Sequence, residues 1–327
     1  MAPPPTIPPA TDPRRARFAW QGFVLDLPRR WNPVRLEGTD DAGHVLIADL
    51  HGPQLGLRWR RVNARKLDAD AWARRAIEAE VGKRFAARAK PLDLPGGRFA
   101  GSMICLEDDP PGRDVWVAHS PASGRVVELV HHVQKRDRAL QDQVLPALRD
   151  IAPTELRPWA IFDLACIVPA GYALKSHRLN AGDVGLTFAA RARPLAIRQL
   201  ALARLALARL PLEKWLAGQE TIIQRHYRRG GDAEAIDVAG ANGLLRRSTR
   251  RRRFAFMRWL PEAVVTLVLH DVARDRLILA QGGDEEAARA LAASALDPAP
   301  ASPAKAGAPH GATAAPEPQT PHTRADD

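Results

Sequence analysis

Cysteine is scarce in this sequence: only Cys105 and Cys166 are present, one in each half of the chain. A small secreted domain held together by disulfide bonds would need more, and no pair of cysteines has the spacing of a structural zinc site. Both lie in apolar segments, SMICLE and DLACIVP, where cysteine usually serves as a small buried hydrophobic residue. The pattern argues against a disulfide scaffold and against a cysteine-based metal site.

Long apolar segments are absent as well. The nearest approach, LAIRQLALARLALARL, is interrupted by Arg198, Arg204 and Arg209, and the start of the sequence has no apolar core of signal-peptide length. We therefore expect a soluble, cytoplasmic protein with no membrane span. The interrupted segment is expected to be a long strand leading into a helix, and the alternative is an amphipathic helix that binds a membrane surface or a partner.

Motifs of catalysis and cofactor binding are also missing. The sequence has no HExxH, no GxxxxGKS or GxGxxG loop and no GxSxG turn. His131 and His132 are adjacent in an expected strand, so their side chains point to opposite faces and cannot share a metal ion. We predict a protein that is not an enzyme and that has no metal and no cofactor.

The formal charge of +11 could indicate binding to nucleic acid. The excess is spread evenly, however, with 25 basic and 20 acidic residues up to Arg157 and 23 and 17 after it. Neither half is a basic domain. Nucleic acid is therefore a less favoured partner than another protein of unknown identity.

Both ends of the sequence are predicted to be disordered. Residues 1–15 are rich in proline, and residues 297–327 form a Pro/Ala-rich tail without apolar residues large enough to offset the entropy of ordering. Between them, GFVLDLPRRW matches DLACIVPAGY at an offset of 141, with Pro28 on Pro169. Further matches follow in the same order and include Trp72 on Trp215, Trp20 on Trp159, and RVVELVHH on AVVTLVLH.

These matches predict a tandem duplication with copies at 16–153 and 158–296. Apolar alternation predicts hairpin strands, a helix that begins after Asp68, more strands and a closing helix over RALQDQVLPALRDI. This order predicts an α+β fold made of two antiparallel-sheet sandwiches. Tryptophans placed alike in both copies are expected in the cores.

The phrase FVLDLPRRW, the later ACIVPAGY and the closing LPALRDI resemble the Mog1/PsbP-like fold, including the bacterial DcrB-like domains. The resemblance covers each copy, although the second has Tyr172 where the first has Trp31. It implies an antiparallel-sheet α/β sandwich and a noncatalytic role as a protein partner, assembly factor or chaperone. DcrB-like chaperones act as dimers, so two fused copies would resemble a single-chain pseudo-dimer.

One stretch, STRRRRFAFMRW, carries unusual charge. Its arginines lie where the first copy has the acidic LEDDPPGRD, the expected connection between two strands, and this connection contains no interleaved aromatic residue. The two loops could be solvated or touch each other, and the alternative is that the basic one reads phosphate, nucleic acid or an acidic protein surface. The candidate anion-binding residues are Arg246, Arg247, Arg250, Arg251, Arg252 and Arg253.

The sequence therefore predicts a noncatalytic, protein-binding adaptor or chaperone-like protein. The alternative is a protein that binds a polyanion through the loop at Arg246 to Arg253.

Overall fold

The structure, a computed structural model, describes residues 12, 14–94, 97–106, 112–133, 139–191, 193–219, 226–254, 256–258 and 260–296. The two segments predicted to be disordered lie outside this part of the chain, apart from Asp12, Arg14 and Arg15, and Arg15 begins the first strand. The α+β prediction is wrong. Three antiparallel sheets dominate the fold, with 51% of the described residues in strands and 22% in helices.

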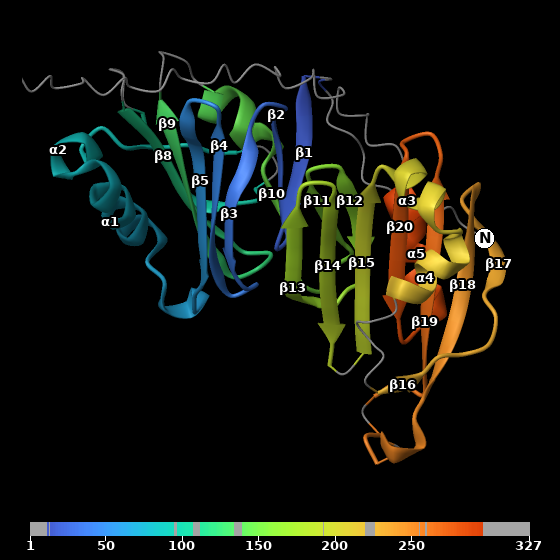
Figure 1. The fold of residues 1–327 in the computed structure, drawn as a ribbon. Coiled ribbons are helices and arrows are strands. Elements are labelled where there is room, and N and C mark those ends of the chain that lie inside the picture. The colour runs from blue at the N-terminus through green and yellow to red at the C-terminus, as the bar shows by residue number, and fades with distance from the viewer. Residues whose placement is uncertain are drawn as a thin grey trace, which may run out of the picture.

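A central sheet of five strands joins the two halves of the chain (Figure 1). Its order is β10-β2-β1-β11-β12, and the direct partners Ala19 and Ala160 join the two hairpins along β1 and β11. The strands are β1 (Arg15–Trp20), β2 (Phe23–Pro28), β10 (Arg149–Asp150), β11 (Arg157–Ile161) and β12 (Leu164–Val168).

The first half adds a seven-stranded sheet in the order β3-β4-β5-β9-β8-β7-β6. Its strands are β3 (Asn32–Gly38), β4 (Ala42–Asp49), β5 (Gly52–Arg61), β6 (Lys90–Pro91), β7 (Ala100–Cys105), β8 (Gly112–Ser120) and β9 (Arg125–Val133). Between β5 and β6 lie η1 (Ala64–Lys66), α1 (Ala69–Val81) and α2 (Lys83–Ala86). As predicted, Asp68 caps α1 by accepting from the Ala71 amide, and Ile77 packs the helix onto β7 and β8.

The second half adds an eight-stranded sheet in the order β13-β14-β15-β20-β19-β18-β16, with β17 also paired to β18. Its strands are β13 (Ala173–Asn180), β14 (Asp183–Ala190), β15 (Arg193–Ala201), β16 (Tyr227–Arg228), β17 (Glu234–Val238), β18 (Ala241–Arg250), β19 (Ala263–Asp271) and β20 (Arg276–Gly282). Its helical segments are α3 (Ala203–Arg209), α4 (Leu212–Gln219), η5 (Arg252–Phe254) and α5 (Glu285–Leu296).

Two expected elements differ from the structure. The segment from Leu195 is a strand only to Ala201, and it continues as the short helix α3. The closing helix of the first half is replaced by two short helical turns, η2 (Ala139–Val144) and η3 (Leu145–Ala147), and by strand β10. Pro146 has no amide hydrogen to donate and so limits a helix here. Losing this helix contributes to the excess of strand over helix.

The strand orders of the two large sheets correspond, which corrects the sequence alignment. Following the hairpins, β8 and β9 correspond to β19 and β20, so RVVELVHH corresponds to RLILAQG rather than to AVVTLVLH. Within the central sheet, the last paired residues before the turn are Trp20 and Phe23 in the first hairpin, and Ile161 and Leu164 in the second. Trp20 therefore corresponds to Ile161, and Trp159 corresponds to Phe18 instead of Trp20. The duplication itself stays a prediction.

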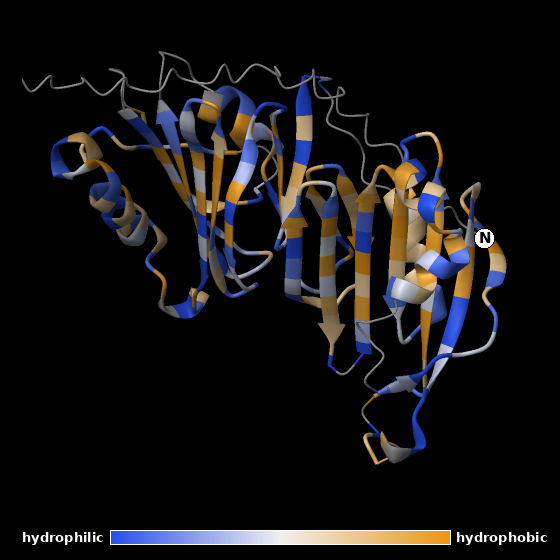
Figure 2. Ribbon diagram, viewed as in Figure 1, coloured by the Kyte–Doolittle hydropathy of each residue, from blue (hydrophilic) through white to orange (hydrophobic). Residues whose placement is uncertain are grey.

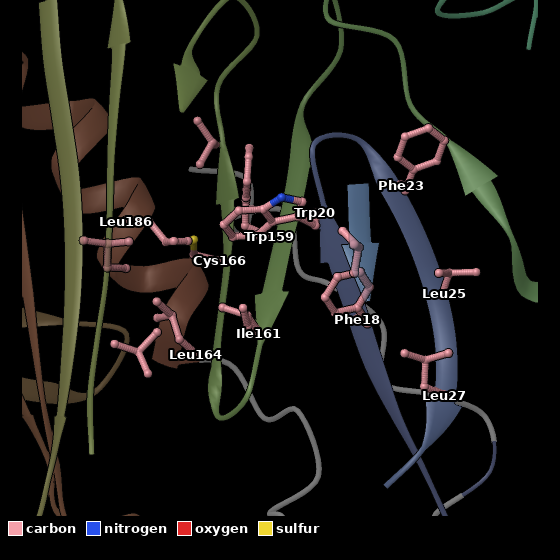
Figure 3. Packing of buried hydrophobic residues seen from close by; sticks show 14 of the residues in the cluster. Phe18, Trp20, Phe23, Leu25, Leu27, Trp159, Ile161, Leu164, Cys166 and Leu186 are labelled. Carbon is pink, nitrogen blue, oxygen red and sulfur yellow. The ribbon is translucent and has the colours of Figure 1, made fainter. Parts of the chain in front are cut away.

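One apolar core extends through both halves (Figure 3). Trp20 of β1 packs against Trp159 of β11 with ring centroids 5.2 Å apart, and Trp159 also packs against Phe188 of β14 at 5.0 Å. The alternation of apolar and polar residues is visible along several strands in Figure 2, and it places one face of most strands in this core. This main core is therefore shared by the two halves, and each half adds a smaller cluster of its own, around Ile77 in the first and Trp215 in the second.

Candidate functional site

The predicted anion-binding arginines do not converge on one surface. Arg246, Arg247 and Arg250 lie within β18, and Arg251, Arg252 and Arg253 lie in or before the short helical turn η5 that follows it. Because side chains alternate along a strand, Arg246 and Arg247 point to opposite faces of the sheet. Of Arg253, only the backbone is among the described parts of the chain.

Two of these arginines pair with carboxylates of the protein. The buried Arg246 has its Nη2 atom 3.6 Å from Glu213 Oε1 of α4. On the other face, Arg247 donates to Glu234 Oε2 at 2.7 Å and to both carboxylate oxygens of Glu285 at the start of α5. These contacts join β18 to β17 and to helices on each face, so a structural role accounts for both side chains.

Arg250 and Arg251 shape the connection that follows β18. Arg250 Nη1 donates to the carbonyl oxygens of Met257 and Leu260, at 2.8 and 2.7 Å. Arg251 Nε donates to the Tyr227 carbonyl at 2.9 Å and thereby fastens the connection to β16. Carbonyl groups that would otherwise face solvent are bound here, which gives the connection a defined shape.

We call residues 226–229 and 250–262 the tip, as far as they are described. Figure 1 shows the tip at the end of the second large sheet that lies opposite α3. Figure 2 shows that much of it is hydrophilic. Phe256 projects with 69% of its surface exposed. Among the described residues, no carboxylate forms an ion pair with Arg228, Arg251, Arg252 or Arg258. The tip exposes the side chains of Arg228, Arg229, Arg251, Arg252 and Arg258.

Four functional candidates at the tip were missed from sequence: Arg228, Arg229, Phe256 and Arg258. The loop predicted from sequence ends at Arg253 and therefore contains no aromatic residue. The structure continues it to β19 and brings the segment HYRR against it through the hydrogen bond from Arg251 and a contact of His226 with Phe254, centroids 4.7 Å apart. The pair of arginines in HYRR and the aromatic residues in FAFMRW were the available signal.

The sequence predicts an acidic loop in the first half as the counterpart of the basic one. Glu107, Asp108 and Asp109 lie outside the described residues. Asp114 belongs to strand β8 and is buried, with its Oδ2 atom 3.8 Å from His131 Nδ1.

A charged cluster that the sequence did not reveal lies beside α1. Arg58 Nη1 of β5 donates to Glu128 Oε1 of β9 at 3.0 Å and also to Glu80 of α1. Arg113 Nη1 lies 3.5 Å from the second oxygen of Glu80. Burial raises the pKa of Glu128 from 4.5 to about 6, and Glu80 adds to the rise while Arg58 opposes it. Burial, together with Arg113, lowers the pKa of the neighbouring His132.

Within the described parts of the chain, no group of three or more His, Cys, Asp or Glu side chains is arranged to hold a metal ion. No described helix is both long and apolar enough to cross a membrane.

No family model matches this sequence, and no curated protein matches it significantly. The resemblance to Mog1/PsbP-like proteins therefore stays a prediction.

Proposed function

We propose that this protein is a noncatalytic adaptor whose tip binds a polyanion, with nucleic acid as the first candidate. The observation that carries the proposal is the group of five exposed arginine side chains at the tip, four of which have no carboxylate partner among the described residues. Guanidinium groups bind phosphate oxygens through paired hydrogen bonds, and they stay charged at any physiological pH.

The shape of the tip supports the same proposal. The hydrogen bond from Arg251 to the Tyr227 carbonyl holds the two segments of the tip together before any ligand binds, and those from Arg250 to the Met257 and Leu260 carbonyls shape the longer segment. A site that is already ordered loses less conformational entropy on binding. Arg246 and Arg247, which pair with glutamates, are not part of the proposed site.

An acidic protein surface is the second candidate, because it would use the same arginines. It is favoured by the adaptor role that the resemblance implies. A nucleic acid differs from it in presenting a regular array of phosphates and aromatic bases, so a comparison of nucleic acid with a polyglutamate chain of equal charge separates the two.

The test is fluorescence anisotropy with labelled single-stranded oligonucleotides at several salt concentrations. The variant Arg251→Ser, Arg252→Ser, Arg258→Ser removes three tip charges. The matched control, Arg65→Ser, Arg74→Ser, Arg84→Ser, removes three exposed arginines near and within α1 and α2. We expect the tip variant to reduce the slope of log K against log salt by about 2, and the control to leave it nearly unchanged. Equal losses in both variants would refute a site at the tip.

A further inference from the structure

Several turns meet at the end of the second sheet opposite the tip, and they expose large apolar side chains. Phe162 lies between β11 and β12, Leu202 and Leu205 begin α3, and Val272 lies between β19 and β20. Their exposed fractions are 46%, 59%, 64% and 73%. We call these four residues the apolar cap. Figure 1 shows α3 at this end of the sheet, away from β16.

Hydrogen bonds hold these turns side by side. The Ala203 amide donates to the Asp275 carbonyl at 3.0 Å, and the Arg204 amide donates to Asp275 Oδ1 at 2.8 Å, so α3 is fixed to the β19–β20 turn. Arg276 Nη1 donates to the Asp163 carbonyl at 3.2 Å, which fixes the β11–β12 turn to the same place. The apolar cap is therefore one surface rather than four separate exposed residues.

Backbone conformation makes two of these residues unusual. Leu202 and Phe162 have φ values of 61° and 51°, in the left-handed region that bulky side chains rarely adopt. Glycine or asparagine would fit there with less strain and without exposing apolar surface. The corresponding turn of the first half has Gln21, at φ 52°, where the second half has Phe162. Neither folding nor solubility explains a large apolar side chain at both strained positions, which points to a binding role.

Most carboxylates at this end are paired with arginines, and the exposed Asp163 beside Phe162 lies close enough to the buried Arg276 to interact with its charge. Asp275 lies 3.3 Å from Arg204, and Asp271 lies 2.8 Å from Arg276. Asp183 near the β13–β14 turn is held by Arg198 at 2.6 Å. These carboxylates therefore add little repulsion toward an anionic surface, while the whole chain carries a formal charge of +11.

The size of the cap decides between a protein and a lipid occupant. Side chains of this type and exposure present on the order of 400 Å², about half of the ~800 Å² that each partner buries in a standard stable interface. Apolar side chains at the ends of turns also form projections, which need a complementary hollow in a protein but not in a deformable bilayer.

We propose that the apolar cap inserts into the surface of an anionic lipid bilayer. Phe162, Leu202, Leu205 and Val272 would enter the boundary between headgroups and acyl chains, and the positive charge of the protein would draw it to the surface. This is peripheral attachment without any spanning segment. It does not depend on polyanion binding by the tip, which lies at the other end of the sheet.

The test is cosedimentation of the full chain with phosphatidylcholine vesicles that contain or lack phosphatidylglycerol. The cap variant is Leu202→Asn, Leu205→Ser, Val272→Ser. The control, Val34→Ser with Leu50→Ser, removes two apolar side chains in the first half that are 61% and 100% exposed. We expect the original protein to bind the anionic vesicles, the control to bind as well, and the cap variant to bind at least about tenfold more weakly.

Other outcomes would overturn the proposal. Equal binding by the cap variant would remove the cap from the interaction, and so would equal losses in the cap and control variants. Loss of vesicle binding only in Arg251→Ser, Arg252→Ser, Arg258→Ser would place the lipid at the tip. A dimer in sedimentation velocity that the cap variant abolishes, without vesicle binding by the original protein, would identify a second copy as the occupant. Circular dichroism verifies that each variant is folded.

Discussion

Arg125 and Arg276 occupy corresponding places in the two halves of the protein. Each begins the last strand of its large sheet directly after a tight turn, and each is buried. Arg125 Nη1 donates to the Gln21 carbonyl at 2.8 Å, and Arg276 Nη1 donates to the Asp163 carbonyl at 3.2 Å. Each arginine thus fastens its large sheet to the turn of a central hairpin, a correspondence that supports the proposed duplication.

We expect Arg125→Met to destabilise the fold more than Arg276→Met. Arg125 pairs with Asp150, whose side chain is 1% exposed, whereas Arg276 pairs with Asp271, which is 11% exposed. Removing Arg125 leaves a buried carboxylate without its compensating charge, at a cost of about 3–5 kcal/mol. Urea unfolding followed by circular dichroism measures the difference.

The double variant Arg125→Met, Asp150→Asn provides the control for this prediction. It removes the uncompensated charge as well as the arginine, and so it should recover part of the lost stability. A loss below about 1 kcal/mol for Arg125→Met alone would contradict the structural role assigned to the pair.

The fold could be predicted from sequence where proline and turn residues fix the register. Pro28 and Pro169 were matched between the two copies, and they lie at or directly after the ends of the corresponding strands β2 and β12; the same offset of 141 relates Ala19 to Ala160, the direct partners between β1 and β11. The pairing of those strands could not be predicted, because it depends on contacts between residues far apart in the sequence.

The alignment failed farther along for a physical reason. Arg125 and Arg276 are 151 residues apart, whereas Pro28 and Pro169 are 141 apart. The second half therefore has ten additional residues between these two points. Strands buried on a sheet share runs of Val, Leu and Ile, and such runs look alike whichever strand they form. AVVTLVLH was therefore matched to β9, although β9 corresponds to β20.

Replacing Trp159 should weaken both halves together. Its ring contacts Trp20 of the first half and Phe188 of the second, within one continuous core. We expect Trp159→Ala to cost about 3–5 kcal/mol because a buried ring leaves a cavity. In the original protein, circular dichroism and tryptophan fluorescence should each report a single thermal transition, and the two transitions should have the same midpoint temperature. Two separate transitions would show that the halves unfold independently.

Glu128 should make stability depend on pH. Its pKa is raised from 4.5 to about 6 in the folded protein, so its contribution to stability is complete below pH 4.5 and is lost as the pH rises through 6. We expect the original protein to lose about 2 kcal/mol relative to Glu128→Gln between pH 4 and pH 7. Urea unfolding of both proteins at several pH values measures this difference.

A second variant at this position separates charge from packing. The corresponding residue of the second half is Leu279, which lies opposite Arg198 as Glu128 lies opposite Arg58. Glu128→Leu should therefore also lack the pH-dependent loss. If the same loss between pH 4 and pH 7 appeared in both variants, Glu128 would not be its source; the lowered pKa of the neighbouring His132 acts in the opposite direction, adding stability as the pH rises.

The candidate site was predictable only in part. The run of arginines marks the right region of the sequence. Because side chains alternate along β18, however, Arg246 and Arg247 lie on opposite faces of the sheet, where each pairs with a glutamate. The arginine pair Arg228 and Arg229 is visible in the sequence, but its place at the tip depends on the pairing of β16 with the end of β18, a contact between segments far apart in the chain.

Phe256→Ala should distinguish single-stranded nucleic acid from other polyanions at the tip. The ring is 69% exposed among exposed arginines, so a base can stack on it, and such stacking contributes about 1–3 kcal/mol per base. We expect the variant to bind single-stranded DNA roughly tenfold more weakly or worse, and to bind heparin, which has no bases, with unchanged affinity. Fluorescence anisotropy with each ligand measures both affinities. Because the change removes no charge, the salt dependence of DNA binding should stay the same. Equal weakening toward DNA and heparin would mean that Phe256 supports the shape of the tip instead of stacking on bases.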